Sequence, residues 1–267
     1  MSDLHSRLEF AVRVAREAGD HTLRYFRRPD LEVESKADLS PVTRADREAE
    51  TLLTERIRTA YPADGILGEE LGETPSKNGC RWILDPIDGT RSFARGIPLF
   101  GTLVALEQDG KDVIGVIHLP ACRETVYAAK GHGAWWQVED ASPEPARVST
   151  VTTLSKATLL STNPEGVDAT GARNALRMLE GACLQLRTWG DCYGYALVAT
   201  GRAEIMIDPR MAIWDAAALI PILEEAGGRF TDWSGNPIAD GGNGIATNGI
   251  FHESVVLRFR NTTSASA

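Results

Sequence analysis

The sequence predicts a mixed α/β (α+β) fold built from two successive halves. Two stretches with helical periodicity come first, and a run of short apolar strands separated by turn residues follows them. An acidic, proline-containing segment at residues 138–146 has the composition of a surface connection, and beyond it strands alternate with helices. We therefore expect an N-terminal α+β half at residues 1–145 and a C-terminal α/β half at residues 146–267.

The N-terminal half begins with two predicted amphipathic helices. Apolar residues recur at three- and four-residue steps over residues 3–27 and again over residues 43–61, where Pro62 ends the second helix. Short strands follow, several of them punctuated by Gly or Pro turns, at residues 65–68, 81–84, 101–107, 113–118 and 125–129. We expect these strands to form a substantial antiparallel sheet.

The C-terminal half alternates between the two element types. Strands are predicted at residues 158–161 and 203–207, and helices at residues 169–180, 192–200, 214–226 and 248–258. The pair Gly227-Gly228 is a strong helix stop, and residues 261–267 have the low complexity of a frayed tail. This alternation indicates a second α/β layer.

Composition excludes several classes of protein. A hydrophobic content of 43% in 267 residues is enough for a packed core, which excludes a disordered chain. The formal charge of −9 lacks the basic surface that a nucleic-acid binder needs, so nucleic acid is not an expected partner. Four arginines interrupt residues 1–26, and the chain has no apolar run of about 18 residues, so we expect a cytoplasmic protein outside the membrane. Four irregularly spaced cysteines fit reduced thiols better than a disulfide framework.

Residues 82–90, Trp-Ile-Leu-Asp-Pro-Ile-Asp-Gly-Thr, are the most informative segment of the chain. An apolar strand ends there in two carboxylates, and the proline and glycine allow Asp85, the Ile87 carbonyl and Asp88 to surround one point. Oxygen ligands of this kind suit a hard cation such as Mg²⁺. A helix that begins at Gly89 and Thr90 would add free N–H groups for a phosphate. A simple helix cap by aspartate is an equally good reading of this segment taken alone.

Two further acidic motifs lie elsewhere. Glu69 and Glu70 follow an apolar strand, and Asp215 stands near the start of an otherwise apolar helix. A solvated charge pair and an N-cap are the structural alternatives for these two motifs.

In this order, the three motifs resemble the inositol monophosphatase family of lithium-sensitive, metal-dependent phosphatases. The resemblance extends from Lys36 to about Asn248 and rests on residues 85–90 and 214–218, with Glu69 placed 16 residues before Asp85. It implies a layered α-β-α-β-α sandwich of the inositol monophosphatase and fructose-1,6-bisphosphatase type, a homodimer, and a small phosphate monoester as substrate.

The resemblance also implies a role for each acidic residue. It assigns Glu69, Asp85 and the Ile87 carbonyl to one Mg²⁺, and Asp85, Asp88 and Asp215 to a second. It places Asp46 near a third, weaker ion, gives Glu70 and Thr90 the task of orienting the attacking water, and leaves the phosphate at Gly89 and Thr90. Two or three Mg²⁺ ions are therefore expected, and Mn²⁺ accepts the same oxygen ligands. Such ions activate water directly, so no covalent protein intermediate is needed.

The choice of substrate depends on residues that would face the leaving group. The segment at residues 190–193 is similar to the histidinol-phosphate phosphatase branch of the family, as are residues 36–43, 91–98 and 246–249. A carboxylate at Asp191 suits a substrate that carries an amine, although a helix cap is its structural alternative. Asp208 stands where inositol-handling members usually carry Glu. The predicted substrate-binding residues are Asp88, Arg187, Asp191, Asp208 and Asp215.

L-Histidinol phosphate is the favoured substrate on these grounds. Inositol 1-phosphate is the alternative, and other sugar or nucleotide phosphates stay open. A regulatory RNA-binding role, which some family members have, finds no support in the charge of −9. A serine nucleophile is excluded because no G-x-S-x-G motif occurs, and the glycine-rich residues 241–244 lack the lysine of a P-loop and are expected to form a turn.

Overall fold

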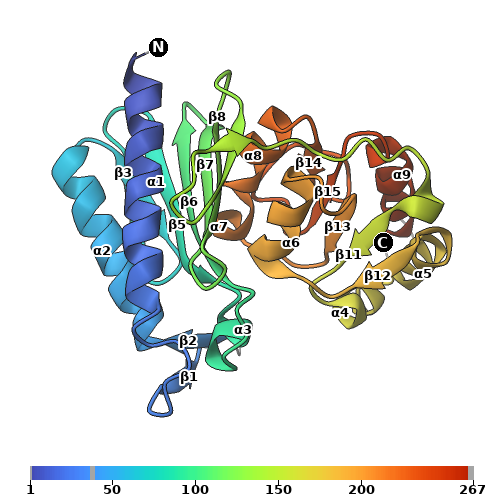
Figure 1. Cartoon of the computed structure of the whole chain (residues 1–267), viewed down its shortest axis with the longest axis horizontal. Helices are drawn as coiled ribbons and strands as arrows, with labels where there is room; N and C mark the ends of the chain where they lie inside the picture. Colours follow the sequence, from blue (N-terminus) through green and yellow to red (C-terminus); the bar gives the residue numbers. More distant parts are fainter. Residues whose placement is uncertain (1, 37–39, 264–267) are drawn as a thin grey trace.

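The computed structural model describes residues 2–36 and 40–263 and contains two large sheets (Figure 1). The eight-stranded sheet has the order β10-β9-β8-β7-β6-β5-β3-β4, and the five-stranded sheet has the order β12-β11-β13-β15-β14. The first comprises β3 (Gly65–Gly68), β4 (Gly72–Thr74), β5 (Cys80–Asp88), β6 (Gly101–Gln108), β7 (Lys111–Leu119), β8 (Glu124–Ala129), β9 (Ala134–Val138) and β10 (Glu144–Pro145). The second comprises β11 (Thr158–Leu160), β12 (Gln185–Arg187), β13 (Ile205–Asp208), β14 (Arg229–Thr231) and β15 (Gly244–Thr247).

Helices cover both sheets and separate them. α1 (Ser2–Thr22) and α2 (Arg44–Ala60) pack on the outer face of the eight-stranded sheet, and α6 (Asp191–Ala199), α7 (Ile213–Ala216) and α8 (Leu219–Glu225) lie between the sheets (Figure 1). The remaining helices are α3 (Thr90–Ala94), α4 (Pro164–Ala169), α5 (Arg173–Ala182), α9 (His252–Thr263) and the short 3₁₀ helix η1 (Leu154–Lys156). With α4, α5 and α9 on the far side of the smaller sheet, the molecule has the predicted α-β-α-β-α layers.

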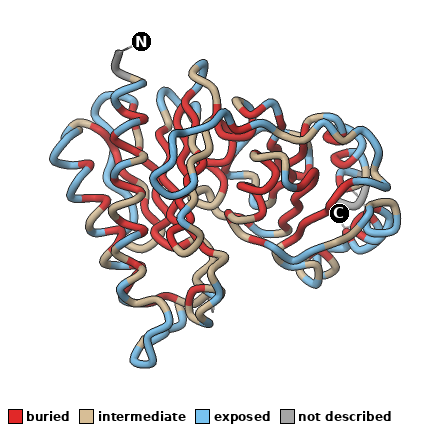
Figure 2. Tube along the Cα trace, in the orientation of Figure 1, coloured by how far each residue is buried: buried red, intermediate tan, exposed pale blue. Residues whose placement is uncertain are grey.

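Apolar residues bury the faces where these layers meet. Alanines at 11, 15 and 18 of α1 are completely buried, which lets the helix approach the sheet closely. A second cluster joins β6 to β8 with α6 and α8, and Figure 2 shows the buried residues concentrated in these central layers. The expected boundary segment at residues 138–146 contains β10, which pairs with β9. The division of the chain into domains at residue 145 stays a prediction.

Several predicted helices have different limits in the structure. The first ends at Thr22 rather than residue 27, because Leu23, Tyr25 and Phe26 turn away to pack beside Phe93 and Phe100. The helix expected at residues 169–180 is replaced by α4 and α5, with Gly171 at a positive φ of 84° between them.

The helix expected at residues 214–226 is interrupted in the same way. Pro221 has no N–H to donate to the carbonyl of Ala217, so α7 and α8 are separate helices. The helix expected from residue 248 begins at His252, because β15 and a turn at Gly249 precede it.

Short strands account for most of the other differences. The structure contains β1 (Val33–Ser35), β2 (Pro41–Thr43), β4, β9, β10, β12, β14 and β15, which the sequence did not predict. The larger sheet is not wholly antiparallel, because β3 and β5 run parallel. α9 includes residues 261–263, so the frayed tail was wrong there, and residues 264–267 lie outside the described chain.

Two expectations from composition can be compared directly with the structure. The four cysteines are free thiols, as expected. Within residues 2–36 and 40–263, none of the helices has the length and apolarity required to cross a membrane.

Candidate active site

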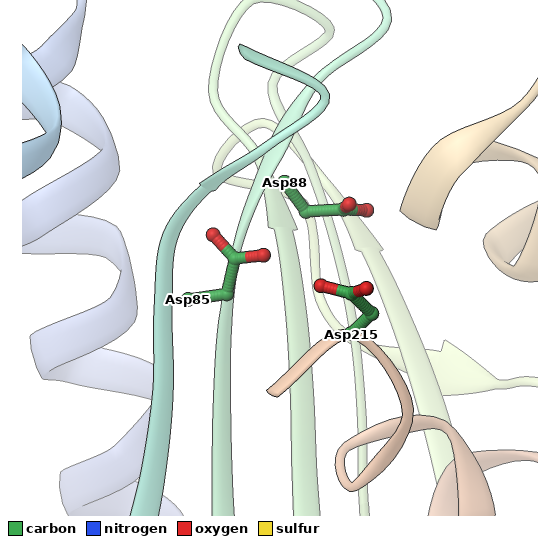
Figure 3. A group of neighbouring side chains, drawn as sticks. All are labelled: Asp85, Asp88 and Asp215. Atoms are coloured by element: carbon green, nitrogen blue, oxygen red, sulfur yellow. The ribbon is translucent and has the colours of Figure 1, made fainter. Parts of the chain in front are cut away.

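Three aspartates meet between the two sheets. Asp85 and Asp88 come from the end of β5, where the pairing with β6 is irregular, and Asp215 comes from α7 (Figure 3). One carboxylate oxygen of each lies within 4.8 Å of the others, and among the described residues this is the only such group of three acidic, His or Cys side chains. The β5 motif and the apolar helix therefore converge as the resemblance implied.

The electrostatics of this group call for a cation. Burial, reinforced by neighbouring carboxylates, raises the pKa of Asp85 and of Asp88 well above the ordinary range. Burial also raises the pKa of Asp215 to about 7. In the described part of the chain, the buried Oδ1 atom of Asp85 has no hydrogen-bond partner. Oxygen-only donors, an orphaned buried oxygen and like charges at close range fit a divalent metal ion.

Main-chain donors fix two of these carboxylates. The Cys192 N–H at the start of α6 donates to Asp88, and the Ala212 N–H donates to Asp215 Oδ2 at 2.7 Å. These contacts tie the orientation of the Asp88 and Asp215 carboxylates to the start of a helix.

Glu69 and Glu70 form a second acidic group beside the first. Lys36 Nζ donates to Glu69 Oε1 at 2.7 Å and to Glu70 Oε1 at 2.6 Å. Burial alone would lower the pKa of Lys36, but the two glutamates raise it above its usual value. Burial raises the pKa of Glu70, and Lys36 opposes that shift. Glu69 therefore lies near the expected metal site but outside the trio of Asp85, Asp88 and Asp215. Its carboxylate is paired with the Lys36 ammonium.

Asp46 and Thr90 lie side by side. The Thr90 hydroxyl lies 2.9 Å from the Ile87 carbonyl and 3.3 Å from Asp46 Oδ1. Asp46 also accepts hydrogen bonds from the N–H and hydroxyl of Thr43 at the start of α2. Burial raises the pKa of Asp46 to about 6. Asp46 thus serves a helix cap on one side and faces the site on the other.

Gly89 makes the sharp entry into α3 possible. Its φ of 90° is unfavourable for other residues, and a Cβ atom there would lie 3.0 Å from Asp191 Oδ2. The first N–H groups of α3 have no partner within the helix and can serve an anion.

Two adjoining cavities of about 420 and 310 Å³ open over these residues. Glu69, Gly89 and Thr90 line the first, and Asp88 and Asp208 line the second. Both are lined by Arg91, Thr162, Asp191, Arg210 and Asp215. A larger cavity of about 910 Å³ between α1 and β8–β9 includes none of the predicted site residues.

Asp191 is placed at the junction of the two cavities. It is the first residue of α6, and Gly190 rather than Asp191 takes the N-cap position, so the prediction that Asp191 is an ordinary N-cap is wrong. Its N–H donates to Thr162 Oγ1 at 2.8 Å, and its φ is 51°. Burial, with Asp208 and Asp215 nearby, raises its pKa to about 7.

Two further predicted substrate-binding residues, Asp208 and Arg187, differ from Asp191. Asp208 accepts bonds from the Thr162 N–H at 3.1 Å and the Tyr195 hydroxyl at 3.0 Å, so both its oxygens are already used. Arg187 is exposed, donates to the Leu186 carbonyl, and lines neither cavity. The sequence did not single out Arg91 or Arg210 as site residues. Arg91 directly follows Thr90, which is a usable signal, whereas Arg210 is marked only by its place between Asp208 and Asp215.

Comparisons with known proteins agree with this geometry. The family model described as the inositol monophosphatase family matches residues 3–263. Histidinol-phosphatase of Chlorobaculum parvum is 43% identical over 255 residues, which cover 95% of this chain and 96% of the relative. Histidinol-phosphatase of Mycobacterium tuberculosis is 39% identical over 95% of this chain and 98% of its own.

A solved structure extends the agreement to the fold. The Thermotoga maritima IMPase superimposes with a TM-score of 0.84 at 31% identity, over 97% of this chain and 99% of that one. The chain therefore belongs to the inositol monophosphatase family.

Proposed function

We propose that this protein is a metal-dependent phosphatase that hydrolyses L-histidinol phosphate to L-histidinol and inorganic phosphate. The observation that carries the substrate choice is the partly buried carboxylate of Asp191 at the junction of the two cavities. The names of the Chlorobaculum and Mycobacterium relatives support the same substrate.

The residues divide into a metal-holding set and a water-orienting set. Glu69, Asp85, the Ile87 carbonyl, Asp88 and Asp215, with Asp46 nearby, would hold two or three Mg²⁺ ions. Bound there, the metal supplies an acidified water and neutralises charge on the phosphate and the leaving oxygen. Mn²⁺ could take the same oxygen donors.

Glu70 and Thr90 are the groups assigned to the attacking water. Thr90 is held between the Ile87 carbonyl and Asp46, so its hydroxyl oxygen has a fixed position. The carboxylate of Glu70 is held by Lys36 and can accept a proton from water when that ammonium moves. The N–H groups that follow Gly89 bind the phosphate oxygens at the start of α3.

Asp191 distinguishes an amine-bearing leaving group from a polyol. Among the described residues, no side chain donates a hydrogen bond to its carboxylate, whereas both oxygens of Asp208 have protein donors. A charge-assisted bond to an ammonium contributes about 1.5–3 kcal/mol, or roughly tenfold to a hundredfold in kcat/KM. Inositol 1-phosphate offers only hydroxyl groups at this position and is the second candidate.

The test is a comparison of kcat/KM for three esters in the presence of Mg²⁺: L-histidinol phosphate, inositol 1-phosphate and fructose 1,6-bisphosphate. We expect histidinol phosphate to be preferred by tenfold or more. A tenfold preference for inositol 1-phosphate would reject the proposed substrate, and absence of phosphate release from every ester would reject the enzyme.

We also propose that the protein is a cytoplasmic homodimer without a nucleic-acid partner. The net charge of −9 supports the last point, since an anionic chain repels the phosphate backbone. Light scattering of the Mg²⁺-loaded protein should give twice the chain mass of 28.9 kDa, and a monomer mass would contradict the dimer.

A further inference from the structure

A separate cavity of about 290 Å³ lies where the β6–β7 turn meets α8 and the segment at residues 237–240. None of the predicted site residues lines this cavity. Its walls carry both signs of charge, unlike the wholly acidic trio of the active site. Arg81, Glu107 and Asp112 form the part of its lining that belongs to the sheet.

These three residues stand in one row across adjacent strands. Arg81 on β5 is opposite Glu107 on β6, and Glu107 is opposite Asp112 on β7. The guanidinium of Arg81 pairs with Glu107 at 2.9 Å and with Glu73 at 3.3 Å. Within residues 2–36 and 40–263 no ion pair to Asp112 is formed, and Asp112 stands opposite the like charge of Glu107, an arrangement that destabilises a strand pair.

Hydrogen bonding in the row is also incomplete. Asp112 Oδ1 and Arg81 Nε are both buried, and neither has a hydrogen-bond partner among the residues that the structure describes. Burial raises the pKa of Asp112 to about 7, and Glu107, Asp240 and Glu224 add to that rise while Arg81 opposes it. Neither unpaired atom is reached by solvent, but Asp112 is part of the lining of the cavity and stands opposite the like charge of Glu107, so a cationic occupant of the cavity would compensate its carboxylate.

The occupant is better matched by an organic ammonium than by a metal ion. Among the described residues, only the trio in the active site places three ligand atoms within 4.8 Å of one another, so this cavity has no comparable ready-made metal cage. Its volume also exceeds the roughly 30 Å³ of one water several-fold. Lys111 and Lys130 line the same cavity and provide positive charge for an attached anionic group.

We propose that this cavity binds a small α-amino acid as its zwitterion, with the ammonium on Asp112 and Asp240 and the carboxylate on Lys111 and Lys130. The cavity is also lined by Ile213, the first residue of α7. Asp215 of the active site lies two residues further along the same helix. The inference is independent of which ester the active site hydrolyses.

The test is calorimetric titration of the full, Mg²⁺-loaded chain at neutral pH with L-alanine as the probe. Methylammonium chloride and sodium acetate at matched ionic strength separate the two charged ends. We expect saturable binding of L-alanine, at least tenfold weaker in Asp112→Asn and in Asp240→Asn. Lys130→Gln should weaken L-alanine binding and leave methylammonium binding unchanged.

Asp109→Asn is the matched control, because Asp109 is an exposed acid in the same turn and does not line the cavity. It should bind L-alanine as the unaltered protein does. Absence of saturable heat at millimolar L-alanine, or equal affinity in the Asp112 and Asp240 variants and the control, would overturn the proposal and leave only ordered water in the cavity. Asp240 is exposed, so its variant keeps the test decisive if Asp112→Asn fails to fold.

Discussion

Lys36 Nζ bridges two glutamates at the edge of the active site, at 2.7 Å from Glu69 Oε1 and 2.6 Å from Glu70 Oε1. The Lys36 ammonium thus binds both carboxylates. The family resemblance assigns Glu69 to a metal ion and Glu70 to the attacking water. The side chains of Lys36, Glu69 and Glu70 are all at least half buried, so solvent screens their attraction less than that of a surface ion pair.

Replacing Lys36 should make the site easier to load. In Lys36→Met the ammonium no longer competes for Glu69, and we expect the Mg²⁺ concentration for half-maximal binding to fall roughly threefold to tenfold. Calorimetric titration of the metal-free protein with Mg²⁺ measures this concentration. Lys156→Met, at an exposed position in η1, is the matched control. Unchanged or weaker Mg²⁺ binding in Lys36→Met would mean that the pair does not compete with metal.

Asp85→Asn should separate activity from stability. Loss of one buried carboxylate removes several kcal/mol of charge stabilisation, which corresponds to about a thousandfold lower kcat. The same change relieves repulsion around an oxygen that has no partner among the described residues, so the free energy of unfolding in chelator should rise by about 1–3 kcal/mol. Phosphate release and urea unfolding in EDTA are the measurements. A metal-free variant less stable than the unaltered chain would contradict the repulsion argument.

Asp191→Asn should change substrate preference more than catalysis. The variant keeps the shape of the side chain but loses its charge, so kcat/KM for histidinol phosphate should fall about tenfold to a hundredfold. Hydrolysis of glycerol phosphate, which has no amine, should change less than threefold. Steady-state kinetics on both esters, with Arg187→Gln as a control outside both cavities, make the comparison. Equal losses on the two esters would reduce Asp191 to a structural residue.

Buried His252 should contribute to acid sensitivity. Burial, with Arg229 nearby, lowers its pKa from 6.5 to about 4. Between those values the unfolded chain binds a proton that the folded chain does not, so stability falls as pH drops from 6.5 to 4. The contribution is at most about 3 kcal/mol. His252→Gln should flatten this part of the urea-unfolding curve against pH, whereas exposed His5→Gln should leave it unchanged. An identical slope in both variants would refute the assignment.

Local sequence signals predicted the parts of the site that lie within one segment. Asp85, Ile87 and Asp88 are neighbours in the chain, and the proline and glycine beside them already indicated a compact turn. Asp215 is 130 residues from Asp85, so only the family resemblance could bring the two together. The contact of Lys36 with Glu69 depends on tertiary packing, and no spacing rule indicates it.

Other misses have specific physical causes. Asp191 was named from the sequence as a substrate-binding residue, but its left-handed φ was not predicted, because aspartate adopts that conformation only occasionally. The strands β14 and β15 are three and four residues long and follow glycine-rich segments, so their β-propensity signal is weak. The interruption at Pro221 was visible in the sequence, but apolar periodicity continues across it.

The three aspartates of the acidic trio are divided between structural layers: Asp85 and Asp88 extend from the eight-stranded sheet, and Asp215 extends from α7 (Figure 3). An ion held by all three would link the sheet to the middle helical layer. Removal of the ion should weaken the contact between this sheet and α7 and leave each sheet intact. In hydrogen exchange, chelation is therefore expected to speed exchange of the amides of α7 while those in the centre of β6 and β7 stay protected.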